Sequence, residues 1–105
     1  MFRHVVMFSW NATVDAAHVR AVTEQLDALR ALIPEIATYQ HGPDAGINSG
    51  NFDYVVVGDF ANVDDYLIYR DHPDHQAFIA NCIAGRLSSR SAVQYAIGST
   101  ARSIA

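Results

Sequence analysis

The 105-residue chain has no lysine, a single cysteine and no long apolar run. One cysteine, Cys82, excludes an intrachain disulfide. A membrane-spanning helix needs ~20 consecutive apolar residues, and no segment approaches that length. The apolar stretch at the start of the chain is too short for a signal peptide and lacks a small-residue cleavage site. These absences predict a cytoplasmic protein that has no membrane partner.

Positive charge is also scarce. The seven basic residues are all arginines, they do not cluster, and the formal net charge is −4. Nucleic acid binding requires a basic stripe or patch, so the sequence excludes nucleic acid as a partner. The chain has neither a glycine-rich phosphate loop nor a nucleophile elbow, and we expect no cofactor.

The composition that is present indicates one packed domain. Half of the residues are hydrophobic, which is typical of a globular protein, and the length suits a single domain. We expect that domain to span residues 1–97. Residues 98–105 are small and polar, and they are predicted to form a C-terminal tail that frays.

Hydrophobic periodicity predicts the elements of the domain. β-branched and aromatic residues indicate a first strand over Phe2–Trp10. A long amphipathic helix follows, with Thr13 as the expected N-cap and Pro34 as the stop. The remaining predicted elements are strands at Ile36–His41, Phe52–Phe60 and Val93–Ile97, and helices that start at Asn62 and at Pro73.

The order β-α-β-β-α-(α)-β predicts an α+β fold of the ferredoxin-like type, with the helices on one face of the sheet. The first and third strands are apolar on both faces, so the face away from the helices also needs a cover. A second copy of the same sheet provides one, which predicts a homodimer through the sheet. The residues that would meet in that contact are Val5, Met7, Val55 and Val57.

Three sequence features carry a resemblance to a known family. They are the first strand Phe-Arg-His-Val-Val-Met-Phe, a long helix that ends Leu-Ile-Pro-Glu-Ile, and the segment Tyr-Arg-Asp-His-Pro-Asp-His-Gln-Ala-Phe. Over residues 2–97 the chain resembles the stress-responsive A/B barrel (Dabb) family. The resemblance implies a dimeric α+β barrel. It implies function less closely, because many members are known as stress-associated proteins, whereas a plant polyketide cyclase among them catalyses an aldol cyclisation.

The resemblance also implies a site. His75 matches the acid–base histidine of that cyclase, and Tyr69 and His4 match residues of its pocket. Chemistry supports the first assignment, because imidazole titrates near pH 6.5 and can exchange protons at neutral pH. The alternative for His75 is a structural hydrogen bond at the junction of two helices. Further contacts to a substrate are predicted for Val6, Phe8, Val56, His72 and Phe78.

The other histidines and the cysteine have simpler interpretations. His72 precedes Pro73, which favours a helix cap and leaves His4, His72 and His75 a poor metal set, so no metal site is predicted. His18 and His41 are predicted at surface or loop positions. Cys82 is predicted to be a small core residue.

Three functions remain open at this stage. The first is binding of a small hydrophobic molecule in a pocket between helices and sheet. The second is a cofactor-free cyclase or lyase that uses His75 and Tyr69, and a cofactor-free monooxygenase on the same type of barrel is a separate, more distant possibility. The third is a structural, stress-associated protein whose pocket is filled by its own side chains. An open cavity larger than roughly 300 Å³ that reaches His75 would favour the first two over the third.

Overall fold

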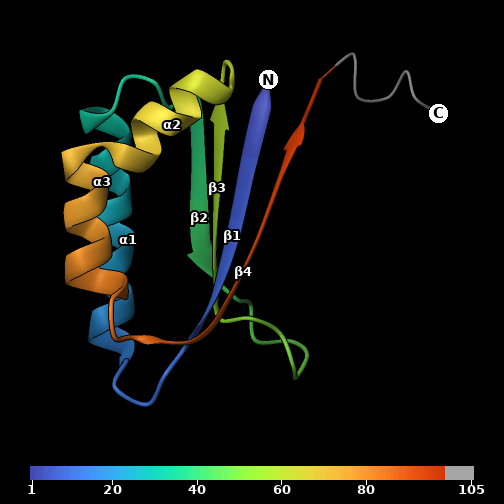
Figure 1. The fold of residues 1–105 in the computed structure, drawn as a ribbon. Helices are drawn as coiled ribbons and strands as arrows, with labels where there is room; N and C mark the ends of the chain where they lie inside the picture. Colours follow the sequence, from blue (N-terminus) through green and yellow to red (C-terminus); the bar gives the residue numbers. More distant parts are fainter. Residues whose placement is uncertain (99–105) are drawn as a thin grey trace.

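A computed structural model describes residues 1–98 of the chain, so the predicted tail lies, apart from Gly98, outside the described residues. Four strands and three helices follow one another, with a single π-helical turn before the last strand (Figure 1). The elements are β1 (Phe2–Trp10), α1 (Ala16–Leu32), β2 (Thr38–Pro43), β3 (Tyr54–Phe60), α2 (Val63–Asp71), α3 (Pro73–Phe78), η1 (Ile79–Ile83) and β4 (Leu87–Ala96).

The four strands form one antiparallel sheet in the order β2-β3-β1-β4. Figure 1 shows the helices of the domain on one side of this sheet. β1 therefore lies in the interior of the sheet, and β2 and β4 form its edges. The predicted α+β, ferredoxin-like fold is confirmed.

The start of α1 differs from the prediction. Asp15 is the N-cap, and its carboxylate accepts a hydrogen bond from the backbone N–H of His18. Thr13 instead belongs to a turn, where its backbone N–H and its hydroxyl both donate to the side-chain oxygen of Asn11. Both Thr and Asp can cap a helix, and the local turn at Asn11 decides which of them does so.

The strands also differ from the prediction at their ends. β2 begins and ends two residues later than predicted, and β3 begins at Tyr54. β4 is the largest difference, because it begins at Leu87 and includes the polar run before Val93. Edge strands carry polar residues without penalty, so the hydrophobic pattern that marks interior strands is missing there.

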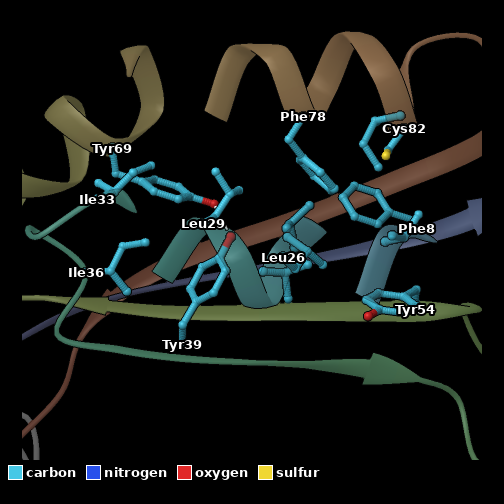
Figure 2. Close-up of a cluster of buried hydrophobic side chains, with 14 of the residues drawn as sticks. Phe8, Leu26, Leu29, Ile33, Ile36, Tyr39, Tyr54, Tyr69, Phe78 and Cys82 are labelled. Carbon is cyan, nitrogen blue, oxygen red and sulfur yellow. Dashed lines mark hydrogen bonds between the residues drawn. The ribbon is translucent and has the colours of Figure 1, made fainter. Parts of the chain in front are cut away.

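The core lies between the sheet and α1, α2, α3 and η1 (Figure 2). The alternate residues His4, Val6 and Phe8 of β1 are buried beneath the helices. Helix α1 contributes a stripe at spacings of three and four, as its periodicity predicted. Cys82 is buried in the same core, as expected. Other fully buried members of this core are Val22, Leu26, Ile33, Tyr54 and Phe60.

The opposite face of the sheet carries no helix. Strand alternation places Val5, Met7, Val55 and Val57 on this open face, where they are half-buried. From β4, Val93 and Tyr95 extend the apolar strip, and they are 56% and 43% exposed. Beyond one end of the strip the Arg3 guanidinium forms a bidentate pair with Asp59, at 2.7 and 2.9 Å.

Among the helices of residues 1–98, none combines the length and the apolar character that crossing a membrane requires.

Candidate functional site

A cavity of about 320 Å³ lies between the sheet and the helices. Its floor is the helix-facing side of the sheet, and its roof is formed by the two short helices and the π-helical turn. The sheet contributes His4, Val6, Phe8, Tyr39, Val56 and Arg90. The helices contribute Leu26, Tyr66, Tyr69, Arg70, His75 and Phe78, and η1 adds Ile79 and Ile83.

The structure brings together every residue predicted for the site except His72. That histidine caps α3, where its Nδ1 accepts a hydrogen bond of 3.1 Å from the backbone N–H of Asp74. His72 is not among the residues that line the cavity, so the structure offers no support for its predicted contact with a substrate. The helix-cap interpretation, which the following Pro73 favoured, is the one that the structure supports.

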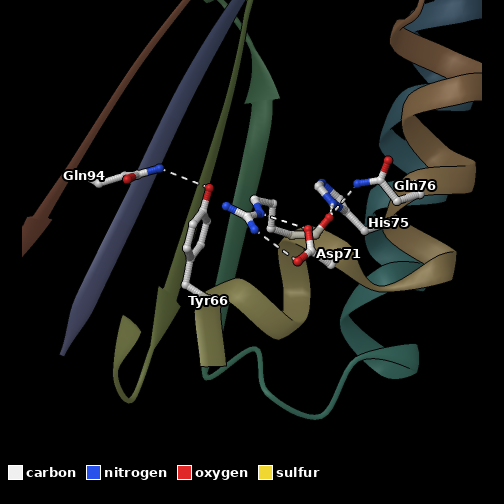
Figure 3. Close-up of polar contacts among 6 residues, drawn as sticks. Tyr66, Asp71, His75, Gln76 and Gln94 are labelled. Carbon is white, nitrogen blue, oxygen red and sulfur yellow. Dashed lines mark hydrogen bonds and ion pairs between the residues drawn. The ribbon is translucent and has the colours of Figure 1, made fainter. Parts of the chain in front are cut away.

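His75 lies in the first turn of α3 and faces the cavity. Its Nδ1–H donates to the backbone carbonyl of Arg70 at 2.9 Å, which leaves Nε2 with a lone pair (Figure 3). The imidazole lies against the ring of Tyr69, with 4.2 Å between ring centroids. Burial lowers the pKa of His75 below its usual value, although the bond to the Arg70 carbonyl opposes this shift. His75 is therefore neutral at pH 7 and presents a basic nitrogen.

His4 has the opposite tautomer. Its Nδ1 accepts a hydrogen bond of 2.9 Å from the side-chain amide of Gln94, so the proton of the neutral ring is on Nε2. The pKa of His4 is lowered to about 4, mainly by burial and further by the charges of Arg90 and His75. His4 therefore remains a neutral hydrogen-bond donor across the physiological pH range.

Two tyrosine hydroxyls meet in the cavity wall. Tyr39 Oη and Tyr69 Oη are 2.7 Å apart, and Figure 2 shows the two side chains pointing toward each other from β2 and α2. Burial raises the pKa of Tyr69 to about 12, and the pKa of Tyr39 is raised as well. Both hydroxyls are therefore protonated. One of the two hydroxyl hydrogens forms the bond between the tyrosines. The other hydroxyl hydrogen remains available to donate to an oxygen atom of a ligand.

Sequence reasoning missed five polar residues of this cavity region, namely Tyr39, Tyr66, Arg70, Arg90 and Gln94. Gln94 bridges His4 and Tyr66, and its amide donates to the Tyr66 hydroxyl at 3.1 Å. Arg90 and Tyr39 line the cavity directly. A signal for Gln94 did exist, because it alternates with Val93 and Tyr95 and must face the helices. No sequence signal identified Arg90, because it lies in the polar first half of β4, which has no hydrophobic alternation and was not predicted to be a strand.

The prediction for His41 is wrong, because it lies in β2 with a buried side chain, whereas His18 is a half-buried residue of α1. The side chain of His41 is 8% exposed, and its nitrogens bond to Asp27 Oδ1 at 2.8 Å and to Tyr54 Oη at 3.0 Å. His18 Nε2 is 2.8 Å from the carbonyl oxygen of Cys82. Both histidines join α1 to the rest of the domain, and neither lines the cavity.

Within residues 1–98 no three His, Cys, Asp or Glu side chains are grouped closely enough to hold a metal ion. A second hollow, of about 340 Å³, lies where the loop of residues 44–53 meets the open face of the sheet. It is lined by Met7, Val55 and residues of the loop, and it contains no histidine or arginine. Of these two hollows, only the helix–sheet cavity is lined by histidine and arginine side chains.

An antiparallel ferredoxin-like sheet with helices on one face, an apolar open face and an internal cavity defines a class of small α+β domains. The chain belongs to the family described as the stress responsive A/B barrel domain, whose match covers residues 2–97. No curated protein sequence matches the chain.

The chain is also similar to several solved structures. A dimeric ferredoxin-like protein of unknown function from Thermobifida fusca YX is 44% identical, with a TM-score of 0.85 over 91% of this chain and 90% of that chain. A dimeric protein of unknown function from Bacteroides fragilis is 28% identical, with a TM-score of 0.76 over 91% and 95%. A hydroxynitrile lyase from Passiflora edulis is 18% identical, with a TM-score of 0.79 over 92% and 93%, and shows a shared fold.

The depressed pKa of His4 predicts a pH dependence of stability. Between the ordinary pKa of about 6.5 and the folded value of about 4, the unfolded chain binds more protons than the folded one. Stability is therefore complete above about pH 6.5 and is lost as the pH falls toward about 4, by up to about 3 kcal/mol from this group. Urea unfolding across this pH range measures the loss.

A matched variant isolates the contribution of His4. His4→Asn keeps a side-chain acceptor for Gln94 but has no proton to gain, so its unfolding free energy should depend less steeply on pH than that of the wild type. Equal pH slopes for the two proteins would show that His4 titrates normally in the folded state.

Proposed function

We propose that the protein binds a small hydrophobic molecule in the helix–sheet cavity. The observation that carries this proposal is the cavity itself, whose volume of about 320 Å³ is sufficient for a small ligand. Its lining is largely aliphatic and aromatic, with a few polar groups that could orient the ligand. This combination is typical of small-molecule sites.

The state of the two cavity histidines argues against a pocket filled by its own side chains. Within residues 1–98, the Nε2 atoms of His4 and His75 have no hydrogen-bond partner, yet no fully buried side-chain N or O atom lacks one. Both Nε2 atoms must therefore be open to the cavity or to solvent. Polar atoms left open in an apolar site favour binding of a ligand that has polar groups of its own.

Binding can be tested with N-phenyl-1-naphthylamine, a neutral apolar dye whose fluorescence rises in apolar surroundings. We expect saturable binding with one site per chain. Ile79→Trp should fill the cavity and weaken dye binding by about tenfold or more, because an overpacked site leaves no room. Fluorescence titration gives both affinities.

The neighbouring residue supplies the control for that substitution. Ala80 is exposed on the same turn and does not line the cavity, so Ala80→Trp should bind the dye as the wild type does. Absence of saturable binding to the wild type, or equal weakening by both tryptophans, would contradict binding in this cavity.

A second candidate function is proton abstraction next to a carbonyl group, as in a cofactor-free lyase or cyclase. The tautomer of His75 favours it, because Nε2 of a neutral imidazole is a general base at pH 7. In this step Nε2 would take the proton from carbon, and the C–H electron pair would move into the carbonyl to form an enolate. The remaining hydrogen of the Tyr39–Tyr69 pair would stabilise the enolate oxygen, and His4 would position the substrate.

His75→Ala tests this candidate against a panel of poly-β-keto thioesters. Loss of a general base should reduce turnover by about 10²–10⁴-fold, and Tyr69→Phe should reduce it less. Gln76→Ala is the matched control, because Gln76 donates to the same Arg70 carbonyl at 2.6 Å without lining the cavity. Equal turnover by wild type and His75→Ala, measured by product formation, would reject catalysis and leave binding.

We also propose that the protein forms a homodimer through the open face of its sheet. The strip of Val5, Met7, Val55 and Val57, continued by Val93, is too apolar to remain in water. Two of the similar structures, those from Thermobifida fusca and Bacteroides fragilis, are described as dimeric. A second copy of the strip would cover this face about a two-fold axis.

Sedimentation velocity at micromolar concentration tests the dimer. The wild type should sediment as a dimer, with an interface of roughly 1,600 Å² or more. Val57→Asp should dissociate or unfold it, because an unpaired charge at a buried contact is costly. Ile68→Asp, at an exposed position on α2, should leave the dimer intact. A wild-type monomer at this concentration would rule out the proposed contact.

A further inference from the structure

The edge strand β4 forms one end of the cavity and carries a cation. Residue pairing places Arg90 beside Phe8 and Gln94 beside His4, on neighbouring strands of the sheet. Because paired residues of adjacent strands share a face, Arg90 and Gln94 lie on the helix side of the sheet. Arg90 lines the cavity, and its charge contributes to the low pKa of His4.

The two arginines of the cavity differ in their electrostatic state. The guanidinium of Arg70 forms two hydrogen bonds with the carboxylate of Asp71, at 2.9 and 3.1 Å, and its charge is therefore compensated (Figure 3). Within residues 1–98 the guanidinium of Arg90 has neither a hydrogen bond nor an ion pair. No Asp or Glu lines the cavity. The β4 end of the cavity thus has one positive charge without a counter-charge.

Two more hydrogen-bond donors lie on the same face of the sheet, at the level of Gln94 and four residues along β4 from Arg90. The amide nitrogen of Gln94 donates both to Nδ1 of His4 and to the hydroxyl of Tyr66, as Figure 3 shows for the second bond. With these acceptor positions occupied, His4 presents Nε2–H and Tyr66 retains its own hydroxyl hydrogen. Arginine has no acceptor. The β4 end therefore offers donors, whereas the basic nitrogen of His75 is an acceptor.

We propose that the ligand is a small amphipathic carboxylate whose carboxylate group is bound by Arg90 and by Nε2–H of His4. This inference rests on the proposed binding function and adds the chemical class of the ligand. The apolar body of the molecule lies against Val6, Phe8 and Phe78. A planar guanidinium matches a carboxylate through two parallel N–H donors, which a lysine could not do.

The charge at the β4 end suits a monoanion better than a phosphate ester. A dianionic phosphate is usually bound by several cations or by a glycine-rich loop at a helix N-terminus. The cavity has one uncompensated arginine. The two short helices that line the cavity, α2 and α3, already have their first turns capped by Asn62 and His72.

Isothermal titration calorimetry with two probes of equal shape tests the inference. 4-Phenylbutanoate carries the carboxylate, and 4-phenylbutanamide is its neutral isostere. At neutral pH the wild type should bind the acid about tenfold or more tightly than the amide, because hydrogen bonds to charged groups are the stronger ones. Arg90→Gln should remove this preference while the affinity for the amide stays within about twofold.

A charge-matched variant separates a local contact from a general electrostatic effect. Arg30→Gln removes the same charge from an exposed position on α1 that does not line the cavity, and it should keep the preference for the acid. Equal affinity of the wild type for both probes, or a preference that survives Arg90→Gln, would overturn the role of Arg90 while binding in the cavity stands. Failure of both probes to bind would reject the proposed binding function, and this inference with it.

Discussion

The interior position of β1 in the sheet is the constraint on which the rest of the structure depends. β1 pairs with β3 on one side and with β4 on the other, so its two sets of alternate side chains define the two faces of the domain. His4, Val6 and Phe8 form the floor of the cavity, whereas Val5 and Met7 belong to the open face. A register slip of one residue would exchange the two sets. It would move His4 out of the cavity and leave the helices without a floor.

Burial has the same effect on both cavity histidines, but their hydrogen-bond partners give them opposite chemical properties. Desolvation lowers the pKa of each ring, so both are neutral at pH 7. Nδ1–H of His75 donates a hydrogen bond to a backbone carbonyl, so Nε2 of this ring keeps its lone pair and is basic. A side-chain amide donates to Nδ1 of His4 and leaves Nε2–H as a donor. One acceptor and one donor in a single apolar cavity are what both proposed functions use.

A second polar network holds α1 on the sheet. Asp27 of α1 bonds to His41, whose other nitrogen bonds to the Tyr54 hydroxyl, and that hydroxyl is 2.7 Å from the hydroxyl of Thr23. The network links one helix to two strands, and every member has a partner, which is the condition under which buried polar groups are tolerated. Together with the bond between His18 and the Cys82 carbonyl, this chain of hydrogen bonds adds directional contacts to the apolar packing of α1.

Hydrophobic periodicity in the sequence was sufficient to predict the element order, the helix side of β1 and the residues beneath the helices. Each of these follows from local alternation, since a strand repeats every two residues and a helix about every 3.6. The convergence of His4, Tyr69 and His75 also follows from face assignments together with the family resemblance. The caps at Asn62 and His72 were predicted by the residues next to them. The features that could be predicted are therefore those that depend on residues close to one another in the sequence.

The partners of the polar groups were decided by the tertiary structure alone. His4 and Gln94 are 90 residues apart in the sequence, and they meet because β4 pairs with β1 in one particular register. The same pairing brings Arg90 to the cavity, although its polar neighbours gave no sign of a strand. His41 was predicted at a surface or loop position, but the packing of α1 on the sheet buries its side chain between Asp27 and Tyr54. Periodicity determines which face a side chain is on, but hydrogen-bond partners and charge compensation depend on long-range register and packing, which no short window contains.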